Sequence, residues 1–160
     1  MKKNLQILLL VFGLIGTVGV MYWRSSPQER AVRFLQELSE VASLKSSDNS
    51  LVRKARSAKI IRYVSDPVEF VLESIRVDRK AKHDDVSTGF LALAFGTSEM
   101  SVEFRDIAVV RSDSELIEVS AFLKTKSGFR AGRYNVETTV LIKLLETDDG
   151  LRLSTVVESD

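Results

Sequence analysis

The chain has 160 residues, with 23 basic and 22 acidic side chains and a formal net charge of +1. This balanced charge gives no reason to expect nucleic acid as a partner. The absence of cysteine excludes a cysteine nucleophile and a lipoprotein anchor. Only one histidine is present, whereas a catalytic zinc site usually needs three protein ligands, so we expect no metal and no cofactor.

The first predicted element is an apolar run from Leu5 to Trp23, which contains no charged side chain. At about 1.5 Å per residue, a helix of this length measures about 28 Å, close to the hydrocarbon thickness of a bilayer. Two lysines precede the run, and an aromatic pair ends it at the depth of the membrane interface. We therefore predict a membrane anchor over residues 1–24 and a single soluble domain over residues 25–160.

A cleaved secretory signal is the alternative interpretation of this run. Such a signal also has a basic start and an apolar core, but its core is usually about 7 to 15 residues long. The basic head favours an N-terminus inside the cytoplasm, although Arg24, Arg30 and Arg33 on the other side leave the charge count divided. We expect a single-pass protein of a bacterial inner membrane, with its C-terminal domain in the periplasm.

A first helix of the soluble domain is predicted from Ser26 to about Leu44. Ser26 can cap the helix, Pro27 suits its first turn, and Glu29 completes a capping box. Apolar residues then recur at steps of three and four and predict one buried stripe. The stripe consists of Ala31, Phe34, Leu35, Leu38, Val41 and Ala42.

A second, shorter helix is predicted between a polar break at 46–50 and the turn at Asp66-Pro67. Its apolar residues lie at helical spacing and predict the buried face, which consists of Leu51, Ala55, Ala58 and Ile61. The helix is also the most basic part of the domain, with five lysines and arginines between residues 53 and 62. Such a face could meet anionic headgroups or an acidic partner, but a solvated helix surface is the commoner explanation.

The next residues change character. Residues 68–77 are rich in β-branched and aromatic side chains and predict the first strand, which a charged link over 78–83 follows. A short helix is then predicted from Asp84 or Asp85 to Gly96, where glycine ends it.

The last third of the chain alternates between apolar and polar side chains, which predicts four strands between residues 100 and 157. A bulge is expected near Asp106, a turn at 112–114, a connection that begins at Ser127, and a hairpin turn at 148–150. Short connections between consecutive strands predict an antiparallel meander that curves around the helices.

This order of elements resembles the nuclear transport factor 2-like cone, the superfamily that includes polyketide cyclases and ketosteroid isomerases. The resemblance covers Pro27 to Glu158 and implies an α+β fold in which two to three helices pack on a curved, mainly antiparallel sheet. The chain looks most like the membrane-anchored bacterial members, and its matching segments contain no catalytic signature. These segments are SPQERAVRFLQELSEVASL, SLVRKARSAKIIRYVSDPVEF, MSVEFRDIAVVRSDSELIEVSAFLKT, RYNVETTVLIKLLE and GLRLSTVVE.

The superfamily typically encloses an apolar pocket, and an isomerase-like site there would need a carboxylate base and an acid that faces the oxyanion. The residues of suitable type are Tyr63, Asp66, Tyr134 and Glu137. None of these pocket candidates maps onto a known site of the superfamily residue by residue. In the alternative interpretation, the two tyrosines are wall residues of the pocket and Glu137 faces solvent. His83 is expected on the surface beside a helix cap.

We expect a non-catalytic binding or scaffold domain that meets a protein partner or a small apolar ligand at the membrane. One alternative is a small-molecule isomerase or cyclase that uses the cone pocket. Another is a subunit of an envelope assembly docked through the sheet, because the strand from Val136 to Leu145 becomes apolar on both faces. The resemblance also implies a homodimer formed through the sheet.

Overall fold

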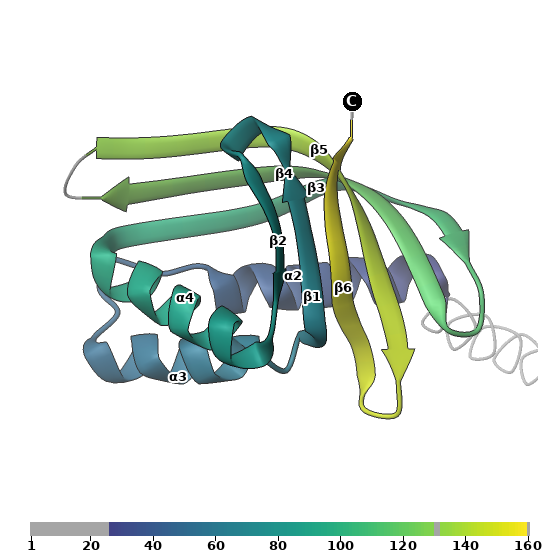
Figure 1. Cartoon of the computed structure of the whole chain (residues 1–160), viewed down its shortest axis with the longest axis horizontal. Helices are drawn as coiled ribbons and strands as arrows, with labels where there is room; N and C mark the ends of the chain where they lie inside the picture. The colour runs from purple at the N-terminus through teal and green to yellow at the C-terminus, as the bar shows by residue number, and fades with distance from the viewer. Residues whose placement is uncertain (1–25, 130–131, 160) are drawn as a thin grey trace, which may run out of the picture.

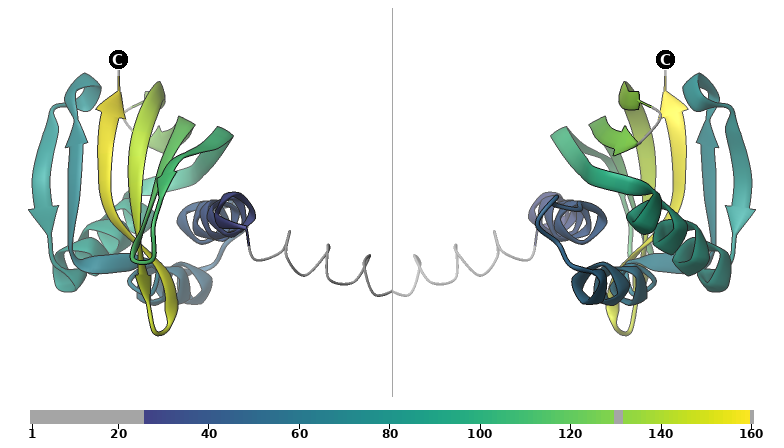
Figure 2. Two further views of the ribbon diagram at one scale, coloured as in Figure 1. Left: turned by 90° about the vertical axis from the view of Figure 1, so that its right-hand side faces the viewer. Right: turned by 90° about the vertical axis from the view of Figure 1, so that its left-hand side faces the viewer.

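The structure is a computed structural model that describes residues 26–129 and 132–159. Three helices lie on the concave side of one curved sheet (Figure 1). Figure 2 views the sheet nearly along its strands and shows it bent into an arch over the helices. The predicted anchor from Leu5 to Trp23 lies outside the described residues. Within those residues, no helix is long and apolar enough to cross a membrane.

Helix α2 spans Pro27–Ala42, and the Oγ of Ser26 accepts a hydrogen bond from the backbone N–H of Glu29 at 3.3 Å. The predicted stripe is confirmed, since its first five residues are buried against the sheet. The helix ends two residues before the predicted position. Its end is set by Leu44, which is extended and exchanges backbone hydrogen bonds with Met100 of the sheet.

Helix α3 spans Ser50–Ile60 and begins at Asn49, whose side chain accepts from the N–H of Val52. The predicted buried face of this helix is wrong at three of its four residues, and only Ile61 is half-buried against the core. Leu51 is 74% exposed, and Ala55 and Ala58 are exposed as well. The helix instead buries the residues that face α4 and the sheet, which are Arg53, Ser57 and Ile60.

The first strand is shorter than predicted and starts earlier. Strand β1 spans Val64–Leu72, a 3-10 turn covers Glu73–Ile75, and strand β2 spans Val77–Ala81. The predicted charged link over 78–83 is therefore wrong, because most of it forms an edge strand that pairs antiparallel with β1. An edge strand tolerates charged residues, since only one of its sides is paired.

Helix α4 spans His83–Gly96, close to the predicted bounds. The backbone N–H of Lys82 donates to the carboxylate of Asp85 at 3.2 Å, which fixes the first turn. Phe90 and Ala94 are the buried residues of this helix.

The predicted meander is confirmed as strands β3 (Thr97–Ser112), β4 (Leu116–Phe129), β5 (Gly132–Thr147) and β6 (Gly150–Ser159). The six strands have the order β2-β1-β6-β5-β4-β3, and the pairing of β1 with β6 is the parallel one. The bulge near Asp106 is confirmed by a shift of register between Arg105 and Ala108. The connection predicted from Ser127 begins later, because β4 continues to Phe129.

The free edge of β3 is occupied by groups from α2 and from the segment that follows it. The side chain of Gln28 donates to the carbonyl of Ile107 at 2.7 Å and accepts from the N–H of Val109 at 2.9 Å. Further along the strand, the Oγ of Ser43 accepts from the N–H of Val102 at 3.0 Å. The backbone of Leu44 pairs with Met100 beyond that point.

The inner face of the sheet forms the core together with α2 and α4. In β5 this face presents Val140, Ile142 and Leu144, each with no exposed surface. On the outer face of the same strand, Leu141 is half-buried and Leu145 is 37% exposed. The predicted apolar character of both faces near the end of β5 is therefore present, and among the described residues only the inner face is covered by helices.

Candidate functional site

The interior of the arch is apolar. Its buried side chains come from α2 and α4 below and from the inner faces of the strands above. Among the described residues, the buried polar side chains are Arg53, Ser57 and Thr97. Each of them hydrogen-bonds a backbone carbonyl. No carboxylate, histidine or tyrosine of the described chain is buried there as an acid or base.

The four pocket candidates do not come together. Tyr63 follows α3 and packs its ring against Phe34, with the ring centres 5.8 Å apart. Asp66 is an exposed residue of β1, and its carboxylate lies 3.9 Å from the Nδ1 of His83. His83 also donates from Nε2 to the carbonyl of Val64 at 3.0 Å, so its ring fastens α4 to β1.

Tyr134 and Glu137 lie on opposite faces of β5. Tyr134 pairs with Ser127 and is 60% exposed near the connection between β4 and β5. Glu137 lies on the outer face, where it forms an ion pair with Lys124 of β4. The hydrogen bond from Lys124 lowers the pKa of Glu137, so this carboxylate is ionised and held by a neighbouring cation.

One carboxylate that the sequence did not single out, Glu158, lies near the end of β6. Glu158 pairs with Val140 of β5 and therefore shares the inner face of the sheet. One of its oxygens accepts from the N–H of Ser74 at 2.7 Å, and the other accepts from the hydroxyl of Thr138 at 2.6 Å. These hydrogen bonds lower the pKa of Glu158, which makes it a poorer proton acceptor than an ordinary glutamate.

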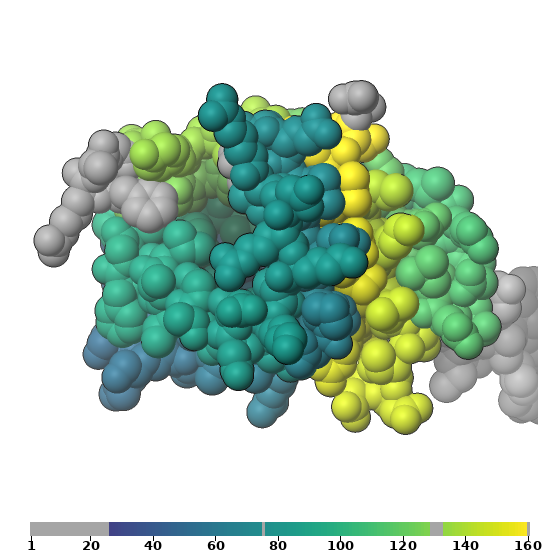
Figure 3. Space-filling view, in the orientation of Figure 1, coloured from purple at the N-terminus to yellow at the C-terminus, as the bar shows by residue number. Residues whose placement is uncertain are grey.

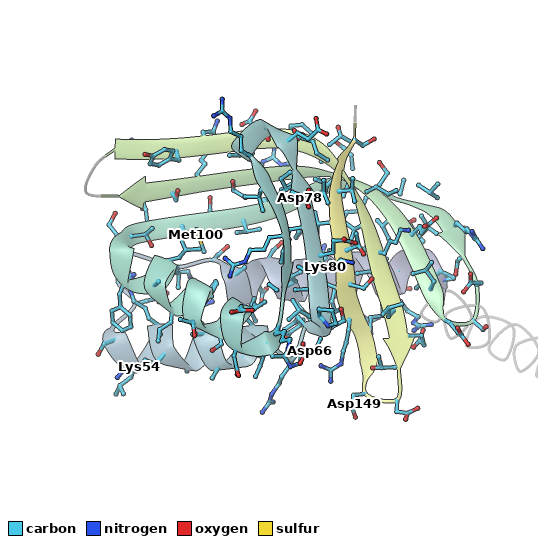
Figure 4. All side chains as sticks on the ribbon, in the orientation of Figure 1. Lys54, Asp66, Asp78, Lys80, Met100 and Asp149 are labelled. Atoms are coloured by element: carbon cyan, nitrogen blue, oxygen red, sulfur yellow. The ribbon has the colours of Figure 1, made fainter. Side chains whose placement is uncertain are left out.

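A cleft of about 840 Å³ lies where residues 43–47 meet the start of β3 and the adjoining ends of β4 and β5. Figure 4 marks this end of the sheet by Met100, away from Asp66 at the start of β1. The register places Leu44, Met100, Ser127 and Tyr134 in one row across three strands and the segment beside them. Most other lining groups are hydroxyls and one amide, from Ser43, Ser46, Ser47, Ser101 and Asn135.

The charges that line this cleft are unequal. Lys45, Lys126 and Arg133 are exposed cations at its wall, and Glu99 is the one acid. Within residues 26–129 and 132–159, none of the three cations forms an ion pair. Lys126 lies close enough to Glu103 and Glu137 to lower the pKa of each, but those carboxylates bond to Arg105 and Lys124 instead.

The buried guanidinium of Arg53 fixes the wall of the cleft. It is 9% exposed and donates only to backbone carbonyls, which is an unusual environment for an arginine. Two of these carbonyls belong to the segment between α2 and α3, and three belong to the junction of α4 with β3. They are the carbonyls of Lys45 (3.2 Å), Asp48 (3.1 Å), Ala94, Thr97 (2.8 Å) and Ser98 (2.8 Å).

A second contact extends this fixed wall into the sheet. The hydroxyl of Ser98 donates to the carbonyl of Gly128 at the end of β4, at 3.1 Å. On the other side, the N–H of Lys45 donates to the carboxylate of Asp48 at 2.9 Å and closes a tight turn. The segment before α3, the start of β3 and the end of β4 are thereby held in one arrangement around the cleft.

Neither the cleft nor the burial of Arg53 was predicted from the sequence. Helix α3 is basic, but one of its four cations is buried, and helical spacing alone does not separate it from the other three. A signal was present in the order of the residues. Arg53 lies at i, i+4 and i+7 with Ser57 and Ile60, which defines a second possible buried face.

No family model and no curated protein matches this sequence, but solved structures do. Kfla4162 of Kribbella flavida superposes with a TM-score of 0.63 at 18% identity, over 81% of this chain and 87% of that one. A Novosphingobium aromaticivorans protein, provisionally named a scytalone dehydratase, gives a TM-score of 0.63 at 8% identity, over 89% and 86%. A Streptomyces avermitilis protein, provisionally named a dehydratase of the NTF2-like family, gives 0.61 at 11% identity, over 82% and 94%.

Identities at this level establish the fold alone. The described residues have the nuclear transport factor 2-like fold, with a curved sheet of six strands and three helices. Because the fold carries both enzymes and binding modules, activity has to be argued from the site.

Proposed function

We propose that this chain is a membrane-anchored, non-catalytic binding domain of the bacterial cell envelope. Its single anchor is the run from Leu5 to Trp23, its location is the inner membrane, and its C-terminal domain is periplasmic. The non-catalytic part of this proposal rests on one observation, which is the kind of side chain that fills the inside of the arch.

General acid–base catalysis needs a proton donor or acceptor within hydrogen-bond reach of the reacting group, with a pKa near the working pH. The described interior is filled by apolar side chains, and its buried polar groups are committed to backbone carbonyls. Glu158, near the end of β6, has a lowered pKa. These features favour binding over proton transfer.

The start of α2 determines where an anchored domain would lie. Ser26 already caps α2, so the folded domain begins three residues after Trp23. If the apolar run spans the bilayer, the domain is held against the membrane surface. Partners or ligands at that surface are then favoured over soluble ones far from it.

A partner surface is available on the outer face of the sheet. Phe122, Leu141 and Val157 are half-buried apolar residues on neighbouring strands of this face, and Leu145 is more exposed. We propose that this face receives either a second copy of the chain or another protein of the envelope. Cross-linking of the intact chain in membranes separates the two, since a homodimer gives a single species of twice the mass.

The anchor is tested by expressing the full chain in a bacterium with a C-terminal alkaline phosphatase, which is active only outside the cytoplasm. We expect phosphatase activity and retention of the protein in carbonate-washed membranes. The matched variant Leu9→Arg with Ile15→Arg should lose this retention, because each charge at the centre of a span costs about 2.5–3.5 kcal/mol. Wild-type protein in the soluble fraction, or an inactive reporter, would overturn the proposal.

A small-molecule enzyme is the alternative, and one observation favours it. The surface is hollowed between β2 and the region where α4 passes into β3 (Figure 3), which offers an opening toward the inside of the arch. The test is turnover of enolisable ketones and hydroxylated aromatic compounds by the purified chain. Turnover that is lost in any of the single variants Tyr63→Phe, Asp66→Asn, Tyr134→Phe or Glu137→Gln would show that the chain is an enzyme and would overturn the binding proposal.

A further inference from the structure

We infer that the cleft between residues 43–47 and the adjoining ends of β3, β4 and β5 is a binding site for a small, hydroxylated anion, such as a sugar phosphate or a sugar acid. The inference rests on the proposed binding function and names the ligand class. The superfamily resemblance suggests an apolar ligand in the pocket inside the cone. The ligand inferred here is of another class, because the cleft lies at the edge of the sheet and is lined by charged and hydroxyl-bearing side chains.

The charge of the cleft favours an anion. Lys45, Lys126 and Arg133 come from three separate segments that line one cleft, with Glu99 as the single opposing charge in its lining. Elsewhere on this domain, many surface cations are neutralised by neighbours, as Lys124 is by Glu137 and Lys143 is by Glu118. The cleft therefore holds positive charge that the described chain leaves without an ion-pair partner.

The neutral groups of the cleft favour a ligand with hydroxyls. The serine side chains and the amide of Asn135 can both donate and accept hydrogen bonds. Leu44 is 2% exposed, but the lining also includes half-buried Met100 and the 60% exposed ring of Tyr134, apolar surfaces against which a sugar ring can pack. A volume of about 840 Å³ lies within the usual range of small-molecule sites and exceeds what a bare phosphate ion requires.

The rigidity of the wall favours a preformed site. Lys45 is held through its carbonyl by Arg53 and through its N–H by Asp48. The end of β4 that carries Lys126 is fastened through Ser98, whose own carbonyl is also bound by Arg53. Binding energy is then not spent on ordering the backbone around the ligand.

The test is isothermal titration calorimetry of the full chain in micelles of a non-ionic detergent. The probes are glucose 6-phosphate, glucuronate and glucose, which share a hydroxylated ring and differ in the charged group. We expect saturable binding of at least one anion that weakens as salt is added, and no saturable binding of glucose. Tighter binding of glucose 6-phosphate assigns a phosphate to the cleft, and tighter binding of glucuronate assigns a carboxylate.

The double variant Lys126→Gln with Arg133→Gln should bind the preferred anion at least tenfold more weakly. The matched control is Lys54→Gln with Arg62→Gln, which removes two exposed cations that do not line the cleft and should leave the affinity unchanged. Circular dichroism checks that both variants are folded. The inference is overturned if neither anion binds, if glucose binds equally well, or if the two double variants behave alike.

These outcomes are independent of the membrane proposal. The titration measures binding to the cleft in micelles and does not depend on where the protein resides in the cell. The phosphatase fusion tests the anchor and does not depend on what the cleft binds. Conversion of a bound probe to product, followed by NMR during the titration, would overturn the non-catalytic function and leave the site in place.

Discussion

Replacement of Arg53 by methionine should strongly destabilise the domain. Methionine keeps much of the length and apolar volume of the arginine stem but has none of its N–H donors. The carbonyls of Ala94 and Thr97, whose hydrogen bonds to Arg53 are buried, would lose these partners, and three less buried carbonyls would depend on water.

The magnitude follows from the two buried contacts. A hydrogen bond to a charged group contributes about 1.5–3 kcal/mol, and the contributions of neighbouring bonds are not additive. Removing the strongly desolvated cation offsets part of the loss, because its burial was itself costly. We therefore expect the free energy of unfolding to fall by about 3–5 kcal/mol, a large share of the roughly 5–15 kcal/mol of a typical domain.

The assay is urea unfolding followed by far-ultraviolet circular dichroism, combined with amide hydrogen exchange. Exchange should accelerate first in residues 43–49 and 94–100, the two segments that Arg53 joins. Lys54→Met is the matched control, because Lys54 is exposed and points away from the sheet at the lower side of α3 (Figure 4). The reasoning fails if Arg53→Met and Lys54→Met are equally stable, or if exchange accelerates uniformly along the chain.

Two further predictions use the same unfolding assay. Ile60→Ala should lower the free energy of unfolding by about 2–4 kcal/mol, whereas Leu51→Ala should change it by less than about 0.5 kcal/mol. The reason is that Ile60 is 5% exposed and Leu51 is 74% exposed. Equal effects of the two variants would support the buried face that helical spacing predicts. Glu158 has a lowered pKa in the folded state, mainly because of the N–H of Ser74, so its stabilising contribution is complete above about pH 5 and is lost as the pH falls through the lowered pKa. Wild type should thus lose more stability than Glu158→Gln between neutral pH and pH 3, and parallel pH profiles would refute this role.

The sequence predicted the elements whose signals are strong and local. The serine-proline start of α2, its apolar stripe and the alternation of the last four strands each require only the residues concerned, and the structure confirms them. The bulge near Asp106 was also predictable, because the alternation of apolar residues shifts there by one position.

The sequence did not predict features that depend on a distant partner. In α3, two faces were available, and the side that carries Arg53 is buried only because α4 and the segment after α2 offer it free carbonyls. Residues 78–81 resemble a link by composition, and they form a strand because β1 provides an edge. The cleft unites residues 43–47 with strand segments that begin more than fifty residues later, so no local pattern indicates it.

The covered edge of β3 has a consequence for how copies of this protein behave at high concentration. A strand of sixteen residues at the border of a sheet normally exposes a row of unpaired amides, which can template pairing with another molecule. Here Gln28, Ser43 and Leu44 occupy such groups at intervals along the strand. Edge-to-edge growth of the sheet into fibrils is therefore obstructed at this border. The opposite border is formed by β2, which is short and charged.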